Sequence, residues 1–456
     1  MTVSIMRPLK IAVIGSGISG LSCAWLLSRH HQVTLFEKDD RPGGHSNTAQ
    51  LDMDERNAVA VDTGFIVYNP VNYPNLVKLF DHLGVETTAT DMSFAVSIEK
   101  GRLEYSGCGL PGFFAQKRNL INTAHWNLLR EILRFYRQAP ELVACAANEP
   151  LTLGQMLSRY GYSRNFIDNH LVPMGAAIWS TPAERMLDYP ALTFLRFCQN
   201  HGLVQLKDRP QWSTVVGGSR EYVKRLLAPL EGRVRYNSRI HKVQRSNAKV
   251  ILHHQHGQQE TFDHVVLACH ADQTLSLLAD PSADERQLLK CFPYQRNRAI
   301  LHSDPSLMPS RKKAWASWNY LCSGEPGEPP AVSYWMNRLQ PLATERDLFV
   351  TLNPPHEPET ELIHRSYLYD HPQFTLDSVS AQRELWTLQG SRNTWFCGAW
   401  FGYGFHEDGL QSGLAVAEAL GGCKRPWHLE NPNSRIHVQP VIQPQAAKIV
   451  EALASC

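Results

Sequence analysis

Apolar and polar residues near the start of the chain predict a strand, a glycine-rich turn, a helix and a second strand. Lys10–Ile14 is a short apolar strand, and apolar residues recur at helical spacing from 21 to 27. Residues 33–36 form a second apolar strand, which ends at Glu37. This order predicts a βαβ unit of a doubly wound α/β domain.

A second strand, loop and helix pattern lies near the end of the chain. Residues 394–397 are apolar, a glycine-rich loop follows, and residues 414–420 form an apolar helix. Strands are also predicted at 239–243 and 263–270. We therefore predict an α/β fold with a discontinuous Rossmann-like domain and a mixed α+β substrate lobe. The domain comprises residues 1–75, 210–285 and 390–423, the lobe comprises 76–209 and 286–389, and residues 424–456 form a C-terminal strap or tail.

Aromatic residues are concentrated in two alternating stretches of the substrate lobe, 315–320 and 333–337. Alternation predicts strands whose aromatic side chains share one face. These side chains could line a substrate site or form part of the hydrophobic core, and the sequence leaves both interpretations open. The candidate catalytic residues are Asn319, Tyr334, Trp335 and Asn337, together with His406 of the C-terminal loop.

Composition and charge exclude several classes of protein. The 456 residues include 45 basic and 43 acidic side chains, so the net charge of +2 provides no overall field that would attract nucleic acid. No apolar run reaches the roughly 20 residues of a membrane-spanning helix, and the first residues are too polar for a secretory signal. We therefore expect a cytoplasmic protein.

Cysteine and histidine spacing predicts no metal site. The 10 cysteines contain no C-x-x-C pair, which argues against a zinc cluster or a disulfide framework. His253, His254 and His256 fall between two predicted strands, where a hairpin turn is a simpler explanation than a metal cluster.

The first glycine-rich turn has the chemistry of a dinucleotide site. Gly15 permits a tight turn, Gly17 lets the backbone approach a pyrophosphate, and Gly20 allows the helix to pack closely on the strand. Glu37 lies near the roughly 20-residue offset at which a carboxylate binds the adenosine ribose and repels a 2′-phosphate. NADP is therefore disfavoured; the alternative is an ordinary glycine turn beside an exposed glutamate.

The next turn, Arg41-Pro-Gly43-Gly44-His45, indicates which dinucleotide is bound. Residues 10–44 resemble the FAD-binding start of the flavin-containing amine oxidases and carotenoid desaturases, where an R-x-G-G turn lies over the flavin diphosphate. The resemblance implies FAD in a Rossmann-like domain of the GR2 type; a plain surface turn is the alternative. It assigns to FAD Gly15, Ser16, Gly17, Ile18, Ser19, Gly20, Glu37, Lys38, Arg41, Gly43, Gly44 and His45, with Thr63 and Gly64 of a following D-x-G element.

The C-terminal pattern resembles the strand and final helix that flank the flavin in these families. The resemblance places Gly398 at the strand end and the amides of Gly409 and Leu410 near the pyrimidine edge of the ring. Ala399 stands where these families usually have an acid, so Asp408 is a candidate replacement. By the same resemblance, the strand that contains Val243 would run beside the adenine. No second G-x-G-x-x-G is present, so electrons should enter from the substrate.

The segments 62–69, 175–180 and 404–409 resemble those of a bacterial group of predicted NAD/FAD-binding, amine-oxidoreductase-like proteins. Similar domains are associated with cyclopropane-fatty-acyl-phospholipid-synthase-like methyltransferases, which suggests a lipid acyl substrate and such a methyltransferase as partner. The stretch 297–302, which matches a lysine-bearing strand of amine oxidases, contains no lysine. This absence argues against an amine substrate.

We therefore predict an FAD-dependent oxidoreductase that removes hydride from an organic substrate, with a fatty acyl chain favoured. The alternatives are a flavin-containing amine oxidase, and a flavin-binding partner of a lipid methyltransferase without turnover of its own. Residues 112–143 combine basic and apolar side chains. This pattern predicts either an ordinary surface helix or peripheral contact with the inner membrane surface.

Overall fold

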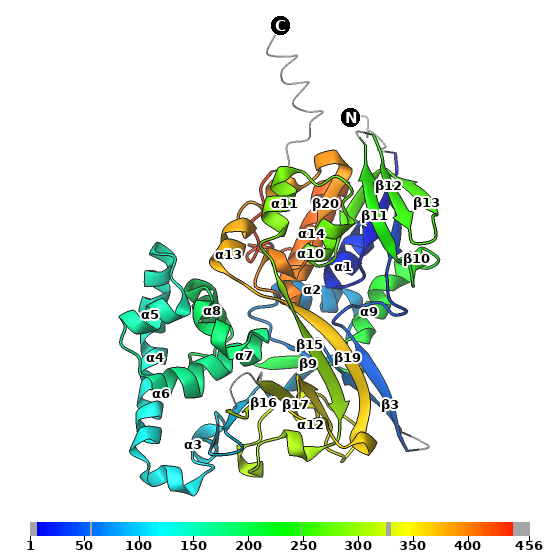
Figure 1. Cartoon of the computed structure of the whole chain (residues 1–456). Helices are drawn as coiled ribbons and strands as arrows, with labels where there is room; N and C mark the ends of the chain where they lie inside the picture. Colours follow the sequence, from blue (N-terminus) through cyan, green and yellow to red (C-terminus); the bar gives the residue numbers. More distant parts are fainter. Residues whose placement is uncertain (1–6, 55–56, 247, 325–329, 441–456) are drawn as a thin grey trace.

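The computed structural model describes residues 7–54, 57–246, 248–324 and 330–440 (Figure 1). A five-stranded parallel sheet forms its upper part in the figure, with strand order β10-β2-β1-β14-β20. The central strands are apolar on both faces, as expected for a parallel sheet that is covered on both sides. The strands are β1 (Lys10–Ile14), β2 (Gln32–Phe36), β10 (Val234–Arg235), β14 (His264–Leu267) and β20 (Thr394–Phe396).

This sheet takes its strands from all three of the segments that we assign to the cofactor domain. Two helices with apolar sequences, α1 (Ile18–Leu27) and α14 (His406–Gly421), pack against each other beside it. An antiparallel three-stranded sheet lies close by, made of β11 (Ile240–Arg245), β12 (Val250–His254) and β13 (Gln259–Phe262). The turn between β12 and β13 carries His256, and no group of residues suited to a metal is found in the described part of the chain.

A seven-stranded mixed sheet forms the lower part, in the order β19-β15-β18-β17-β16-β7-β8. Only β16 and β7 pair in parallel; the other neighbours are antiparallel. The long strands β15 and β19 run side by side between the two parts (Figure 1). The bounds are β7 (Phe94–Ile98), β8 (Leu103–Ser106), β15 (Tyr294–His302), β16 (Trp318–Cys322), β17 (Ala331–Trp335), β18 (Phe349–Leu352) and β19 (Ile363–Pro372).

Helices on the left of Figure 1 complete the substrate side. They are α3 (Gly109–Phe113), α4 (Thr123–Asn148), α5 (Leu153–Arg159), α6 (Arg164–Phe166), α7 (Val172–Trp179) and α8 (Ala191–Asn200). Two small sheets pair β3 (Thr48–Asp54) with β4 (Asn57–Asp62), and β9 (Trp212–Val215) with β5 (Val67–Tyr68) and β6 (Thr87–Thr90). The remaining helices are α2 (Pro74–Leu83), α9 (Arg220–Leu227), α10 (Ala271–Leu277), α11 (Ala283–Leu289), α12 (Met336–Leu339) and α13 (Leu376–Gln382).

Several element boundaries differ from the sequence prediction. Helix α14 begins at His406 rather than at residue 414. The first aromatic strand begins only at Trp318, and the second ends at Trp335, where α12 starts. Within the described ranges, no helix is long and apolar enough to cross a bilayer.

Residues after 423 lie against the cofactor side as far as the structure describes them. The buried Arg425 pairs with Glu418 of α14 at 2.8 Å, and its guanidinium also donates to Asn75 of α2. Trp427 stacks on Trp25 of α1 with 6.2 Å between ring centroids. This segment therefore ties α1, α2 and α14 together.

Candidate cofactor and substrate site

A cavity of about 770 Å³ is lined by residues from both glycine-rich loops and from the seven-stranded sheet. Its volume lies within the roughly 300–1,000 Å³ that is typical of ligand sites. The sequence-predicted residues that line it are Gly15, Ser16, Gly17, Ile18, Ser19, Glu37, Lys38, Arg41, Gly43, Gly44, His45, Gly64, Tyr334, Gly398 and His406. Those outside the lining are Gly20, Thr63, Val243, Asn319, Trp335, Asn337, Asp408, Gly409 and Leu410.

The three glycines of the first loop differ in what surrounds them. Gly15 has a φ of 104°, in the left-handed region that favours glycine. A Cβ on Gly20 would lie 1.9 Å from the carbonyl oxygen of Gly15, so no side chain fits there. A Cβ on Gly17 would meet nothing within 4 Å and would enter the cavity. Gly17 therefore leaves room for a ligand rather than for another part of the protein.

Glu37 stands at the end of β2 beside this loop. Its carboxylate accepts hydrogen bonds from the backbone N–H of Ser16 at 3.0 Å and of Asp39 at 3.0 Å. These two N–H donors hold the carboxylate at the cavity wall.

The R-x-G-G turn lies directly against the first glycine loop. The backbone N–H of Gly43 donates to the carbonyl of Ser16 at 3.0 Å, and a Cβ on Gly44 would lie 3.2 Å from the Cα of Gly17. The Arg41 guanidinium donates to the carbonyl of Gly44 at 2.9 Å, so its positive charge sits over the turn. Two adjoining glycine turns, a fixed arginine and the Glu37 carboxylate line one cavity, which fits a dinucleotide diphosphate and ribose.

Close packing of α1 against α14 brings the two glycine-rich loops together. A Cβ on Gly413 would lie 2.2 Å from the carbonyl oxygen of Ser19, and one on Gly409 would lie 2.9 Å from Ile18. Only glycine permits this approach of the two helices. The N–H of Gly409 donates to the carbonyl of Phe405 at 3.1 Å, so it is used within the helix.

Asp408 acts at the start of α14. Its carboxylate accepts from the N–H of Phe405 at 2.8 Å and lies 3.5 Å from Arg435. Burial raises the pKa of Asp408, and Arg435 opposes that rise. The side chain therefore fixes the loop that carries Phe405 and His406 into the cavity lining.

Two partly buried histidines line the cavity as neutral side chains. The Nε2 atom of His406 lies 2.9 Å from the Ser46 hydroxyl and 2.8 Å from the Tyr222 hydroxyl, and burial lowers its pKa well below the usual value. Burial also lowers the pKa of His45 to about 4, and nearby positive groups, including Arg41, add to the effect. The Nε2 atom of His45 has no hydrogen-bond partner among the described residues.

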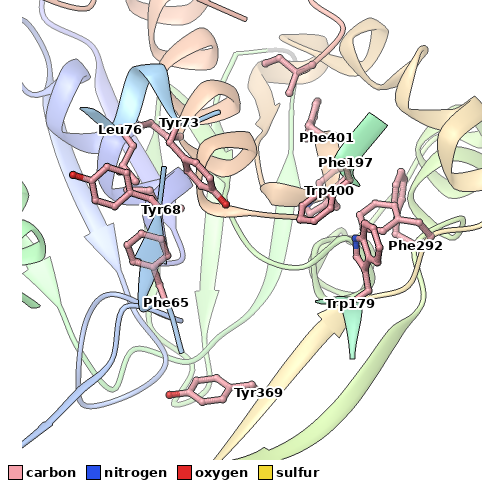
Figure 2. Close-up of a cluster of buried hydrophobic side chains, with 14 of the residues drawn as sticks. Phe65, Tyr68, Tyr73, Leu76, Trp179, Phe197, Phe292, Tyr369, Trp400 and Phe401 are labelled. Atoms are coloured by element: carbon pink, nitrogen blue, oxygen red, sulfur yellow. The ribbon is translucent and has the colours of Figure 1, made fainter. Parts of the chain in front are cut away.

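Aromatic side chains wall the remainder of the cavity. Trp318 and Tyr334 pair across β16 and β17, edge to face, with 5.0 Å between ring centroids. Figure 2 shows further lining residues on opposite sides of one space, with Phe65 and Tyr73 on the left and Trp179, Phe197 and Trp400 on the right. This part of the cavity lining is predominantly aromatic.

The three candidates of the aromatic strands that lie outside the lining have structural partners instead. Asn319 bonds the backbone of Ala316 and Ser333, and Asn337 bonds the backbone of the loop before β18. The Trp335 indole donates to Asp347 at 2.9 Å. Side chains alternate across a strand, so Tyr334 faces the cavity while Trp335 turns away from it.

Sequence reasoning missed lining residues contributed by α7, α8 and β19. Trp179 ends α7 and Phe197 lies in α8, and only their packing brings them to the cavity. On β19, aromatic or histidine residues alternate at 367, 369 and 371. Tyr369 and His371 line the cavity, but so do Leu368 and Asp370 between them, so the alternation alone would not have identified the lining positions.

Two glycine-lined loops on one cavity, with an acidic residue closing β2, define a protein of the dinucleotide-binding class. Residues 18–304 match the family model of the flavin-containing amine oxidoreductases. The chain belongs to this family, and a flavin-containing family implies FAD as the cofactor. The resemblance seen in the sequence is thereby confirmed.

The chain is similar to curated proteins over part of their length. It is 26% identical, over 63% of each chain, to a Mycobacterium tuberculosis protein that carries the name of a flavin-containing monoamine oxidase. It is 25% identical to a 15-cis-phytoene desaturase of an Oncidium hybrid, over 63% of this chain and 50% of the desaturase. The matches thus span less than two thirds of these relatives.

Solved structures support the fold assignment. A putrescine oxidase mutant aligns with a TM-score of 0.65 at 16% identity, covering 90% of this chain and 98% of its own. A fatty acid isomerase from P. acnes aligns with a TM-score of 0.61 at 16% identity and the same coverage. The α/β fold with a parallel Rossmann-like sheet and a mixed substrate-side sheet is confirmed.

Proposed function

We propose that this protein is an FAD-dependent oxidoreductase that removes hydride from a carbon of an apolar, fatty-acyl-like chain. The observation that carries the proposal is the aromatic wall of the cavity, centred on the Trp318–Tyr334 pair. An alkyl chain gains free energy by leaving water for such a wall. The isomerase and desaturase among the similar proteins act, by their names, on a fatty acid and on phytoene.

The charges around the cavity also disfavour a cationic substrate. The charged residues among its described lining are Glu37, Lys38, Asp39, Arg41 and Asp370. The first four belong to the turns that we assign to the ribose and diphosphate. Asp370 is already paired with Arg296 at 2.9 Å. No free carboxylate in the described lining therefore stands beside the aromatic wall to receive an ammonium group.

Desaturation removes a hydride from one carbon and a proton from its neighbour. FAD, when bound, supplies the hydride acceptor. The protein must hold the chain in position, and the proton is released to water. Trp318 and Tyr334 would orient the chain, because both side chains line the cavity.

For the setting of this reaction, we propose a cytoplasmic protein that meets its lipid at the inner membrane surface. A cyclopropane-fatty-acyl-phospholipid-synthase-like methyltransferase is the proposed partner. The association of similar domains with such methyltransferases, described above for the sequence, supports this choice of partner. The alternative role is a flavin-binding subunit of that methyltransferase without turnover of its own.

An amine oxidase is the second candidate function. The family itself and the likeness to a putrescine oxidase favour it. The lysine-free stretch at 297–302 and the paired state of Asp370 count against it.

Anaerobic mixing of the purified yellow protein with candidate substrates separates these functions. We expect phospholipid with long acyl chains to bleach the flavin absorbance and putrescine to leave it unchanged. Trp318→Ala should slow the bleaching while flavin content is retained, since Trp318 belongs to the substrate wall. Bleaching by putrescine alone would favour the oxidase. If neither substrate bleaches the flavin and a methyltransferase co-purifies with the protein, the result would favour the role of a flavin-binding subunit without turnover.

A further inference from the structure

Exposed apolar side chains gather on one short segment at the edge of the helical region. Of the ten large apolar residues that are exposed in the described chain, four lie here: Leu110 is 65% exposed, Leu120 53%, Ile121 88% and Trp126 48%. They lie on α3, on the short helix η1 (Lys117–Ile121) and on the first turn of α4. We call these four residues, with Lys117 and Arg118, the tip surface.

The fold holds these side chains outward. The Trp126 indole donates to the carbonyl of Leu120 at 2.9 Å and packs on Phe114 with 4.8 Å between ring centroids. Beneath them, the buried His125 bonds the carbonyl of Phe113 at 2.9 Å. The exposed apolar residues therefore sit on a packed base with a defined shape.

The charged side chains of the segment that carries the tip surface are all basic. Residues 105–130 contain no aspartate or glutamate, and Lys117, Arg118 and Arg130 are exposed. The short helix η6 (Lys312–Ala314) packs against α3 within the exposed run 311–313. Arg311 and Lys312 of this run pair with Glu104 at 2.8 Å and with Asp347 at 3.9 Å, so the run adds chiefly the charge of Lys313. In Figure 1 the segment around α3 forms the lower left end of the molecule, far from the parallel sheet.

We propose that the tip surface docks on an anionic lipid bilayer. Apolar side chains that protrude between basic residues fit the boundary between acyl chains and anionic headgroups. A second copy of this chain fits the surface less well. In a symmetric dimer, the same surface of both copies would meet. Lys117 and Arg118 of the two copies would then repel each other, because residues 105–130 contain no acid that could pair with them.

The docking element is the tip and not the length of α4. Arg134 of this helix donates to the carbonyl of Tyr160 at 2.6 Å, and Phe135 is fully buried. These residues, which contribute to the amphipathic pattern of the sequence, are already used inside the protein. The structure therefore moves the membrane contact to the N-terminal end of the helix.

Vesicle flotation of the flavin-loaded full chain tests this inference. The probes are vesicles of phosphatidylcholine alone and vesicles with added phosphatidylglycerol. We expect binding to the anionic vesicles that weakens as salt is raised. The double variant Leu110→Ser/Ile121→Ser should lower the partition coefficient at least tenfold. Its matched control, Val71→Ser/Leu206→Ser, changes side chains that are 72% and 66% exposed on other segments and should bind normally.

Charge is tested by a second pair of variants. Lys117→Ser/Arg118→Ser should weaken binding by roughly fivefold for each residue removed. Lys207→Ser/Arg209→Ser, an exposed basic pair elsewhere, is the control and should have a clearly smaller effect. Retained flavin absorbance shows that each variant is folded.

Three outcomes would overturn the inference. They are no binding to anionic vesicles, equal losses in the tip and control variants, or a change of oligomeric state in the tip variants without any change in vesicle binding. The inference deepens the proposed location at the inner membrane surface, and it does not depend on the proposed reaction. Vesicle binding without flavin bleaching would refute the acyl substrate and leave the docking surface standing.

Discussion

Replacing Gly17 and Gly20 separately by alanine should distinguish binding of the cofactor from folding of the protein. Both glycines belong to one six-residue turn, yet their surroundings are opposite. At Gly17 an added Cβ meets nothing within 4 Å, and the backbone there is extended, with φ −66° and ψ 176°. At Gly20 the same atom would lie 1.9 Å from the Gly15 carbonyl oxygen and 3.0 Å from the Cβ of Ala268.

The expected magnitudes follow from these distances. Gly17→Ala should change the free energy of unfolding of the FAD-free protein by no more than about 0.5 kcal/mol. It should weaken FAD binding by roughly 10- to 150-fold, since a methyl group in the cavity would cost about one charge-assisted hydrogen bond of 1.5–3 kcal/mol. Gly20→Ala should lower the free energy of unfolding by about 1–3 kcal/mol through overpacking, although alanine normally stabilises a helix.

Two measurements test the pair. Urea unfolding of the FAD-free protein, followed by circular dichroism, gives the stability, and titration of that protein with FAD gives the affinity. A Gly17→Ala protein with undiminished FAD affinity would refute the idea that this glycine makes room for the cofactor. A Gly20→Ala protein as stable as the wild type would refute the packing argument.

Three further perturbations probe the site and the fold. Glu37→Gln keeps the shape of the side chain beside Ser16 but removes its charge, so FAD affinity in the same titration should fall about tenfold; equal affinity would count against ribose binding. Gly413→Ala should lower the free energy of unfolding in urea by about 1–3 kcal/mol, because its Cβ would lie 2.2 Å from the Ser19 carbonyl oxygen; a gain would contradict the close helix contact. Burial lowers the pKa of His170 to about 4, so the unfolded chain takes up a proton first as the pH falls from about 6.5 to 4, and up to about 3 kcal/mol of stability is lost over that window. His270 and His302 have pKa values lowered to about 4 as well, so His170→Phe should reduce the slope of stability against pH there and not abolish it; parallel curves for the two proteins would exclude a contribution from His170.

The parts of the fold that could be predicted are those set by local sequence. The apolar strand, the glycine turn and the helix from Ile18 lie within a few residues of one another, so the pattern alone defines them. The start of α14 was missed because Gly409 and Gly413 each disfavour a helix by about 1 kcal/mol. The packing of these glycines against α1 outweighs their low helix propensity. This packing joins residues far apart in the sequence, so no local pattern predicts it.

The candidate site divides in the same way. The residues that we assign to the dinucleotide, such as Gly17 for the diphosphate and Glu37 for the ribose, are found by spacing because they lie close together along the chain. The substrate wall draws Trp179, Phe197 and Tyr369 from three distant elements. Their meeting depends on how helices pack on a sheet, which the sequence pattern does not encode locally.

The strand order of the parallel sheet dictates when a growing chain can first hold its cofactor. Strand β1, made early in synthesis, pairs with β14 at His264–Leu267, and β14 pairs in turn with β20 at Thr394–Phe396. A ribosome must therefore release most of the polypeptide before this sheet can close. Until then the apolar face of the first βαβ unit lacks the neighbouring strands that cover it in the finished fold.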